Sequence, residues 1–410
     1  MPKPASETGQ SQIPAVPTVD PEAARVADRL SRNTIECLPV GALAERLSLG
    51  RPLRIKLGLD PTAADLHLGH TVVLQKLREF QDEGHTVVLI IGDYTARVGD
   101  PSGRSATRPV LEPAEIDAHA RTYLEQAAHV LATDERLEVR RNSDWLDMPM
   151  EDLFRLVRHV TVAQLLERDD FAQRYARNEP VSMLELLYPV LQGYDSVAVD
   201  ADVEVGGSDQ KFNLLMGRDL QSAFGRPQQV VMTLPLLVGI DGGRKMSKSY
   251  GNHVGITDAP EEIYGRTLRI PDEVLPDWYR LLLGDEAAPE ASPRDAKRLL
   301  ARALVSRFHG GDAAVAAEEA FDRLFVTREL PADIPEADLG PATGVVHLPA
   351  LICTLFGGSR SEARRKLAQG GVRLDGRPLD GETLDLPATE LDGRVLQLGK
   401  RNFRRLRAVG

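Results

Sequence analysis

Residues 53–70 read LRIKLGLDPTAADLHLGH, and this stretch contains the signals for a strand, a turn and the start of a helix. The segment LRIKLGL at 53–59 is strand-like, and Asp60-Pro61-Thr62 predicts the turn that ends it. From Leu68 to about Gly84 the apolar residues follow helical spacing, with a glycine near the end. A strand that leads directly into a helix is the repeating unit of α/β proteins.

Similar signals alternate along the chain that follows. Strands are predicted at TVVLIIGD (86–93), LEVRRN (137–142), DVEVGG (202–207) and QVVMTLPLL (229–237), and an amphipathic helix at PAEIDAHARTYLEQAAHVLA (113–132). This alternation predicts an α/β fold with a doubly wound, Rossmann-like parallel sheet. Ligands bind such sheets beyond the carboxyl ends of the strands, so residues after the strands at 53–59, 86–93 and 202–207 are the first candidates for a site.

The composition is that of a globular protein with an acidic balance. Of 410 residues, 42% are hydrophobic and 27% are charged, and the net charge is 50 − 61 = −11. These values argue against wholesale disorder and exclude a uniformly basic surface. No apolar run approaches the roughly 18 residues of a membrane helix, and Cys37 and Cys353 are too few for a disulfide framework or a four-cysteine zinc site. The N-terminus lacks the apolar core of a secretory signal, so we expect a cytoplasmic protein.

Shifts in composition indicate where the chain divides. The tail is rich in Pro, Ser and Gln, and a second stretch is rich in Pro and acidic residues, which is typical of a linker. The predicted parts are a flexible tail (1–20), a Rossmann-like catalytic domain with N-terminal helices (21–242), a mobile loop (243–252), a helical domain (253–326), a linker (327–344) and a small α+β domain (345–410).

The C-terminal part is basic although the whole chain is acidic. Residues 359–410 hold 12 Lys/Arg and 7 Asp/Glu, a balance of +5, so the remainder carries −16. A basic module on an acidic protein indicates contact with nucleic acid. The residues predicted to contact RNA are Arg360, Arg364, Arg365, Lys366, Arg401, Arg404 and Arg405.

Two histidines follow the first strand. His67 and His70 are three residues apart where the next helix begins, and a helix N-terminus suits phosphate. Imidazoles at this position can donate to a phosphoryl group as its charge develops. The alternative is a pair of helical histidines without a role. A zinc site is disfavoured because no cysteine or acidic cluster supplies the other ligands.

A second motif, GRKMSKSYGN at 243–252, is a basic loop with glycines and hydroxyls. Lys245 and Lys248 can neutralise a triphosphate, and the Gly and Ser content lets the loop close over it. Taken alone, the loop could be an ordinary basic surface segment.

With both motifs in one α/β chain, the sequence resembles the class I aminoacyl-tRNA synthetases. The intervening residues, and a C-terminal part similar to S4-type RNA-binding domains, narrow the resemblance to bacterial tyrosyl-tRNA synthetases. It covers nearly the whole chain from about residue 30. It implies that tyrosine and ATP form an adenylate with release of pyrophosphate, and that tRNA(Tyr) then accepts tyrosine on its terminal ribose. It also implies Mg²⁺ with ATP and a homodimer, with no structural metal.

A third constellation carries the expected specificity. Tyr188, Gln192 and Asp195 in YPVLQGYDSV lie on one face of a helix because their spacings are four and three. The resemblance implies that the first two hold the ammonium and carboxylate of tyrosine and that Asp195 accepts the phenolic hydroxyl. Phenylalanine would leave that acceptor unpaired, a form of rejection for which this family is the standard example. The alternative is an amphipathic helix with a solvated polar stripe.

The resemblance also assigns the remaining site residues. Implied catalytic residues are His67, His70, Lys245, Lys248 and Thr62. Implied ATP-binding residues are Gly69, Gly207, Asp209, Ser247, Lys248, Arg104 and Arg108, the two arginines having a solvated turn as their alternative. Implied tyrosine-binding residues are Asp60, Thr95, Asp100, Tyr188, Gln192, Asp195 and Gln210.

One residue departs from the family pattern. Many members have a tyrosine at the position of Lys56, where it helps to bind the substrate phenol. Recognition of the phenol would then depend on Asp195, unless Lys56 pairs with that acid and weakens its role.

Three alternative functions are considered: a synthetase for another amino acid, another class of enzyme and a protein without catalysis. A tryptophan enzyme is disfavoured by the segment from Tyr188 to Asp195, by Gly-Gly-Ser-Asp-Gln at 206–210 and by the C-terminal part. A small-molecule nucleotidyltransferase would need neither the Lys-Met-Ser-Lys-Ser loop nor a basic tail. A synthetase-derived RNA-binding protein without catalysis would have no need for intact His67, His70, Lys245 and Lys248.

Overall fold

The structure of the protein, a computed structural model, describes residues 19–62, 65–101, 112–284, 291–326, 334–341, 343–399 and 402–409. The chain forms two compact units: Met1–Asp258 with Arg269–Lys297, and Ala259–Leu268 with Arg298–Gly410. Within the described residues, no helix combines the length and apolarity needed to cross a bilayer.

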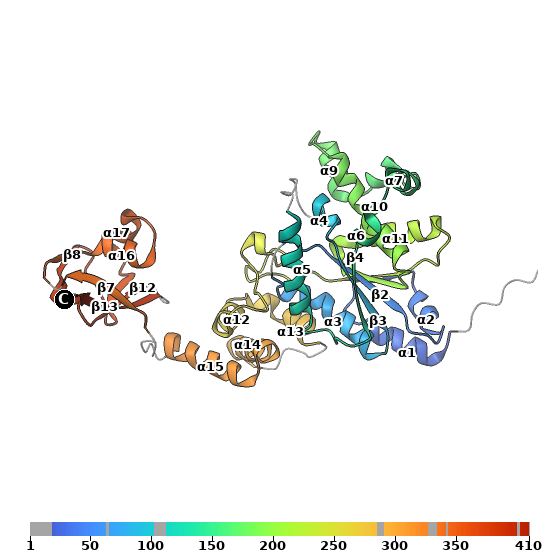
Figure 1. Cartoon of the computed structure of the whole chain (residues 1–410). Helices are drawn as coiled ribbons and strands as arrows, with labels where there is room; N and C mark the ends of the chain where they lie inside the picture. Colours follow the sequence, from blue (N-terminus) through green and yellow to red (C-terminus); the bar gives the residue numbers. More distant parts are fainter. Residues whose placement is uncertain are drawn as a thin grey trace, which may run out of the picture. The chain divides into compact units, whose positions relative to one another are not determined.

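The first unit, called the catalytic unit below, is built on a mixed sheet (Figure 1). In the described part of the chain the strand order is β1-β6-β5-β2-β3-β4. The bounds are β1 (Glu36–Leu38), β2 (Arg54–Leu59), β3 (Thr86–Ile91), β4 (Leu137–Arg141), β5 (Val203–Gly207) and β6 (Val230–Leu234). Five strands are parallel, as predicted, but β1 pairs antiparallel with β6 at the edge. The prediction of an entirely parallel sheet was therefore wrong at this strand, which is only three residues long.

Helices cover both faces of this sheet. They are α1 (Pro21–Leu30), α2 (Ala42–Leu47), α3 (Leu68–Asp82), α4 (Thr95–Val98), α5 (Pro113–Ala127), α6 (Ser143–Leu146), α7 (Met150–Val157), α8 (Val162–Leu165), α9 (Asp169–Ala176), α10 (Met183–Ala198), α11 (Lys211–Ala223) and α13 (Leu275–Leu283). The crossover through α3 leads from β2 to β3, and the crossover through α11 leads from β5 to β6 on the other side of the sheet. Right-handed crossovers in opposite directions place α3 and α11 on opposite faces.

The strand order reverses between β2 and β5, which pair in parallel. After β4 the chain returns across the sheet through α10, which packs closely on α11 because of two glycines. A Cβ on Gly193 would lie 2.9 Å from Leu220 Cδ1, and one on Gly217 would lie 2.8 Å from Ser196 Oγ. This close packing fixes α10, which carries three predicted site residues, beside the crevice where strand order reverses.

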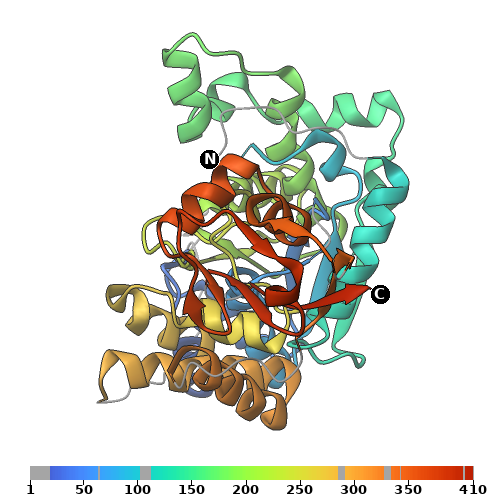
Figure 2. The same ribbon diagram turned by 90° about the vertical axis from the view of Figure 1, so that its left-hand side faces the viewer.

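The second unit contains a five-stranded sheet with the order β10-β9-β12-β13-β7 among the described residues (Figure 2). Its strands are β7 (Glu336–Pro341), β9 (Val372–Leu374), β10 (Arg377–Pro378), β12 (Val395–Leu398) and β13 (Asn402–Val409), with β8 (Val345–His347) and β11 (Asp385–Pro387) forming a separate pair. Its helices are α12 (Pro260–Thr267), α15 (Gly311–Phe321), α16 (Leu348–Phe356), α17 (Arg360–Ala368) and α18 (Ala388–Leu391). Leu348, Leu367, Leu396 and Leu406 belong to its core.

Two boundaries differ from the predicted divisions. The second half of the predicted linker, residues 327–344, contains β7, which pairs in parallel with β13. Proline and acidic residues suggested a linker, but backbone pairing at a sheet edge tolerates both. The predicted helical domain, 253–326, is divided between the units: Ala259–Leu268 and the part from Arg298 onward belong to the second unit, and the second of these divisions falls inside α14 (Pro293–His309).

Candidate active site

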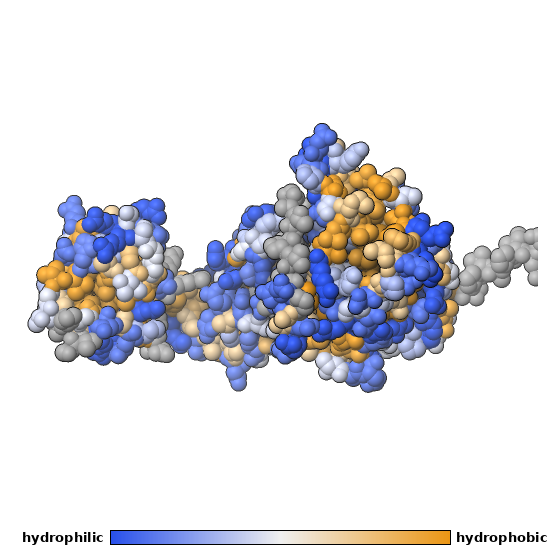
Figure 3. Space-filling model, turned by 45° about the horizontal axis from the view of Figure 1, so that its top comes forward, coloured by the Kyte–Doolittle hydropathy of each residue, from blue (hydrophilic) through white to orange (hydrophobic). Residues whose placement is uncertain are grey.

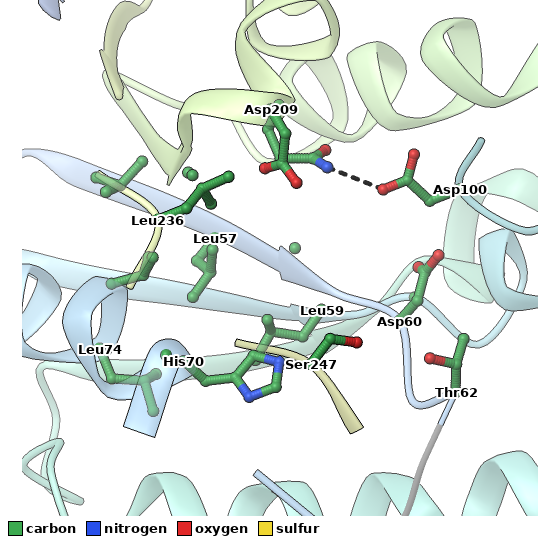
Figure 4. A pocket seen from close by; sticks show the side chains of 18 of the residues that line it. Leu57, Leu59, Asp60, Thr62, His70, Leu74, Asp100, Asp209, Leu236 and Ser247 are labelled. Atoms are coloured by element: carbon green, nitrogen blue, oxygen red, sulfur yellow. Dashed lines mark hydrogen bonds between the residues drawn. The ribbon is translucent and has the colours of Figure 1, made fainter. Parts of the chain in front are cut away.

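A pocket of about 690 Å³ lies in the catalytic unit at the carboxyl ends of β2 and β5 (Figure 4). Its lining contains Asp60, Thr62, His67, Gly69, His70, Thr95, Asp100, Tyr188, Gln192, Asp195, Gly207, Asp209, Gln210, Lys245, Ser247 and Lys248. The structure therefore brings together every described residue that the sequence predicted for catalysis, ATP and tyrosine. Arg104 and Arg108 lie outside the described residues. The individual roles remain predictions.

The imidazoles of His67 and His70 both accept backbone hydrogen bonds at the start of α3. The Gly69 N–H donates to His67 Nδ1 at 3.1 Å, and the His67 N–H donates to His70 Nδ1 at 3.1 Å. Because both Nδ1 atoms accept, each neutral imidazole carries its proton on Nε2. The pair is thus a capping box that leaves two Nε2–H donors at a helix N-terminus, where an anion is favoured.

Both imidazoles are held neutral at physiological pH. Burial lowers the pKa of His70 to about 4, and the charge of Lys248 acts in the same direction. Burial, the neighbouring histidines and Lys248 place the pKa of His67 far below its usual range. These groups therefore act as hydrogen-bond donors and not as charges.

The Lys245–Ser249 loop is anchored while its lysines face carboxylates. Asn252 is buried, accepts from the Ser247 N–H at 2.8 Å and donates to the Lys245 carbonyl at 3.1 Å. Lys245 Nζ lies 2.6 Å from Asp209 Oδ2, and Lys248 Nζ lies 2.6 Å from Asp65 Oδ2. A triphosphate offers these ammonium groups more negative charge than a carboxylate does.

Hydrogen bonds connect the end of β2 with α4 and α10 at the other side of the pocket. Tyr188 Oη donates to Asp60 Oδ2 at 2.9 Å, and Thr95 Oγ1 donates to Asp60 Oδ1 at 2.7 Å. Gly92 makes the second contact possible, since a Cβ there would lie 2.1 Å from Asp60 Oδ1 and 2.4 Å from Thr95 Oγ1. With its proton directed to Asp60, the Tyr188 oxygen presents lone pairs to a donor such as an ammonium group.

Asn213 orients two glutamines of the site. Its Nδ2 donates to Gln192 Oε1 at 2.9 Å and to Gln210 Oε1 at 3.0 Å. Gln210 Nε2 in turn donates to Asp100 Oδ2 at 2.8 Å (Figure 4). Because both amide oxygens accept from Asn213, Gln192 keeps its amide N–H groups as donors. Asn213 itself receives a hydrogen bond from the buried Arg168 at 2.8 Å.

Asp195 is a buried carboxylate in the pocket wall. It is 2% exposed, Trp145 Nε1 donates to its Oδ1 at 2.8 Å, and Asn142 Nδ2 donates to its Oδ2 at 3.4 Å. Burial raises the pKa of Asp195 to about 7, although the charge of Lys56 and both hydrogen bonds oppose this rise. A carboxylate accepts up to about four hydrogen bonds, so it can still receive one from a ligand.

Lys56 pairs with Glu204 and not with Asp195, so the alternative of a Lys56–Asp195 pair is wrong. Lys56 Nζ lies 2.7 Å from Glu204 Oε1, and the two residues face each other across β2 and β5. Lys56 is completely buried and does not line the pocket.

A family model for class I tRNA synthetases (W and Y) matches residues 48–326, which is more than half of the chain. The chain belongs to this family. Two full-length relatives of this synthetase carry the name tyrosine–tRNA ligase. The protein from Moorella thermoacetica is 47% identical over 95% of this chain and 97% of its own length. The protein from Haemophilus influenzae is 46% identical over 93% of this chain and 96% of its own length.

Solved structures share the fold of this synthetase. Tyrosyl-tRNA synthetase from Aeropyrum pernix matches with a TM-score of 0.58 at 20% identity, covering 73% of this chain and 99% of its own. A C-terminally truncated mitochondrial tyrosyl-tRNA synthetase from Coccidioides posadasii matches with a TM-score of 0.58 at 22% identity, covering 72% of this chain and 91% of its own.

The predicted RNA-contacting residues of this synthetase do not all share one surface. Arg360, Arg364 and Arg365 are exposed on α17, while Lys366 pairs with Glu362 at 3.1 Å. Consecutive residues of β13 point to opposite faces of the sheet. Arg404 accordingly lies on the face of α16, with its guanidinium 5.6 Å from the ring of Phe356, and Arg405 lies on the other face. Arg401 is outside the described residues.

Several site residues of this synthetase were missed from the sequence: Gly92, Asn142, Trp145, Glu204 and Asp65. Asn142 directly follows β4, so the same rule on strand ends could have found it. Nothing in the sequence pattern distinguished Asp65 from other surface acids.

Proposed function

We propose that this pocket activates L-tyrosine with ATP and delivers it to tRNA(Tyr), as a tyrosine–tRNA ligase. The observation that carries the proposal is the combination of a buried, hydrogen-bonded Asp195 with histidine Nε2–H donors and two loop lysines in one pocket. A carboxylate selects a phenol, while the donors and lysines suit a triphosphate. The activity and the ATP requirement agree with the family and with the name of the full-length relatives.

The proposed roles in tyrosine binding are inferred from the hydrogen bonds among the pocket residues. Asp195 accepts the phenolic hydroxyl of tyrosine. Asp100 and the Tyr188 oxygen accept from its ammonium group, with Asp60, Thr95 and Gln210 holding these acceptors in place. Gln192 uses its free amide N–H groups for the carboxylate.

The proposed ATP-binding part of the pocket is formed by the N-terminus of α3 and the Lys245–Ser249 loop. The tyrosine carboxylate oxygen attacks the α-phosphorus, and the bond to pyrophosphate breaks. Lys245, Lys248 and the Nε2–H groups of His67 and His70 take up the charge on the leaving pyrophosphate. Gly69, Ser247 and Thr62 shape the phosphate site, and Gly207 with Asp209 receives the ribose. Arg104 and Arg108 are proposed to contact phosphate from outside the described residues.

Mg²⁺ is proposed to arrive on ATP. No group of three His, Cys, Asp or Glu side chains in the described residues could hold a metal ion by itself. Mg²⁺ commonly uses substrate phosphates with only one or two carboxylates, and Asp65 and Asp209 lie beside the lysines of the phosphate site. The ion would screen phosphate charge there.

The second step uses the RNA. A hydroxyl of the terminal ribose attacks the carbonyl carbon of the adenylate, and AMP leaves. We propose that the domain from β7 onward is S4-like and binds tRNA through Arg360, Arg364, Arg365, Lys366 and Arg404, with Arg401 and Arg405 as further predicted contacts. The body from residue 21 to 242 and its loop would carry the chemistry of the cytoplasmic enzyme.

A homodimer is proposed from the catalytic surface. Exposed apolar side chains gather on α7 to α10: Met150, Phe154, Val162, Tyr175, Met183 and Leu184. Figure 3 shows a broad apolar area on this unit. Patches of this kind mark protein interfaces, and a second copy is the simplest partner for a self-complementary patch.

The test is ATP–pyrophosphate exchange with each of the twenty amino acids. Tyrosine is expected to support exchange with a far higher kcat/KM than any other amino acid, phenylalanine included. Exchange with tryptophan would indicate the related tryptophan enzyme, and exchange with no amino acid would favour a nucleotidyltransferase or an RNA-binding protein.

A further inference from the structure

A buried ion pair joins Lys56, which does not line the pocket, to Glu204, which does, and this pair has no role in the function proposed above. Lys56 Nζ donates hydrogen bonds to the Gln192 carbonyl at 2.9 Å and to Ser196 Oγ at 2.7 Å, and it lies 2.7 Å from Glu204 Oε1 in an ion pair. The side chains of Lys56 and Glu204 are 0% and 1% exposed. The ammonium group is therefore engaged inside the protein, and because Lys56 is fully buried and does not line the pocket it does not bind a substrate directly.

Two of the Lys56 contacts flank Asp195 in the chain. Gln192 precedes it by three residues and Ser196 follows it, so both contacts lie on the segment of α10 that carries this carboxylate. Ser196 Oγ also donates to Glu204 Oε2 at 3.0 Å. The ammonium group thus joins β2, α10 and β5 at the level of Asp195.

Two charges of the described chain act on Asp195 from neighbouring strands. The charge of Lys56 on β2 favours its ionised form, and the weaker effect of Glu204 on β5 opposes it. The segment after β4 contributes the uncharged donors Asn142 and Trp145, and Tyr188 on its own helix is neutral. Lys56 is consequently the cation that favours the ionised form of Asp195 and opposes part of the effect of burial.

We propose that Lys56 is a positioning residue for substrate selection, which fixes α10 and keeps Asp195 an ionised acceptor for the tyrosine phenol. This inference rests on the proposed function. The tyrosine that many family members have at the position of Lys56 would contact the substrate phenol directly. Lys56 instead acts on the phenol through the Asp195 carboxylate. Its loss should therefore change recognition of the phenol and leave phenylalanine almost unaffected.

The experiment compares kcat/KM for tyrosine and phenylalanine in pyrophosphate exchange between pH 5.5 and 9. For the wild-type protein we expect kcat/KM for tyrosine to rise with pH as Asp195 ionises, because this parameter follows groups of the free enzyme. The phenylalanine profile should lack that step. If both substrates gave the same profile, the proposed role of Asp195, and with it the basis of the inference, would fail.

Variants of the ion pair should move the step in opposite directions. Lys56→Met should shift the midpoint for tyrosine upward by about 1 pH unit or more, and Glu204→Gln should shift it downward. The double variant removes both charges without leaving either unpaired, and its midpoint should lie above that of the wild type. Lys76→Met is the matched control, because Lys76 is 3% exposed and bonds two carbonyls outside the pocket.

The inference is overturned if the tyrosine step exists in the wild type but stays at the same pH in every folded variant of the pair. It is also overturned if Lys76→Met shifts the step equally, because the effect would then be a general loss of packing. If a single variant fails to fold, the remaining variants still test the inference, because each has its own expected direction of shift in the midpoint for tyrosine.

Discussion

Lys248 Nζ lies 2.6 Å from Asp65 Oδ2, so the second lysine of the Lys245–Ser249 loop is paired with an acid only two residues before His67. The loop and the start of α3 are thereby held together without any ligand. Both side chains are partly exposed, at 29% and 49%, so the pair contributes little to stability. A triphosphate arriving between them would replace Asp65 as the partner of Lys248.

We expect Lys248→Ala to lower the rate of adenylate formation by roughly 10²–10³-fold, because the lysine stabilises charge that develops on pyrophosphate. The free energy of unfolding should change by no more than about 1 kcal/mol. Pyrophosphate exchange and thermal unfolding measure the two effects. Lys211→Ala is the control, since Lys211 also pairs with an acid, Glu36, but lies outside the pocket. Normal exchange in folded Lys248→Ala would refute the role.

ATP binding should not depend on the titration of His67 or His70 near neutral pH. The pKa of His70 is lowered to about 4 and that of His67 lies far below its usual range, so both are neutral from pH 6 to 8. We expect the KM for ATP at saturating tyrosine to stay constant across this interval. A KM that changes with a midpoint near 6.5, and no longer does so in His70→Asn, would show that His70 titrates normally.

Gly92→Ala should disturb the tyrosine site. A Cβ would lie 2.1 Å from Asp60 Oδ1 and 2.4 Å from Thr95 Oγ1, so the hydrogen bond between these side chains would be broken or displaced. We expect the KM for tyrosine to rise and the free energy of unfolding to fall by about 1–3 kcal/mol. In Gly311→Ala the Cβ meets open space, so this control should change neither quantity. An unchanged KM in Gly92→Ala would show that the Asp60–Thr95 contact is dispensable.

Arg360, Arg364 and Arg365 should matter for RNA and not for activation. Replacing all three by alanine is expected to reduce tRNA charging by roughly tenfold or more and to weaken its salt dependence, because phosphate contacts release counterions. Tyrosine-dependent pyrophosphate exchange should stay normal. Arg25→Ala and Arg155→Ala together form the control, since both arginines are exposed on the catalytic unit. Equal loss of exchange and charging would indicate that α17 supports the fold instead.

The local patterns predicted much of the catalytic sheet. The strands β3 and β6 are mainly apolar and buried on both faces, which explains why their pattern was readable. The strands β2 and β5 are also mostly buried, although each contains a charged residue, Lys56 or Glu204. Strand β1 was missed because Glu36–Leu38 is short and owes its conformation to pairing with β6. Strand β7 was missed for the same reason, since its partner β13 lies far along the chain.

The residues of the candidate site also fall into those that the sequence predicts and those that it does not. His67, His70, Lys245 and Lys248 occur in motifs whose spacing is visible in sequence. Contacts between distant segments carry no such signal. The hydrogen bond from Trp145 to Asp195 joins residues 50 positions apart, and the Lys56–Glu204 pair depends on which strands are neighbours. Only the folded sheet shows that Lys56 faces Glu204 and not Asp195.

The central claim is that Asp195 selects tyrosine by its phenol, and the ratio of kcat/KM for tyrosine to that for phenylalanine in Asp195→Ala tests it most directly. Tyrosine alone loses a charge-assisted hydrogen bond, so the ratio should fall by roughly 10- to 100-fold or more. Asp93→Ala is the matched control, because Asp93 is a buried acid bonded to Ser143 outside the pocket, and its ratio should not change. A ratio in folded Asp195→Ala equal to that of the wild type would contradict the account.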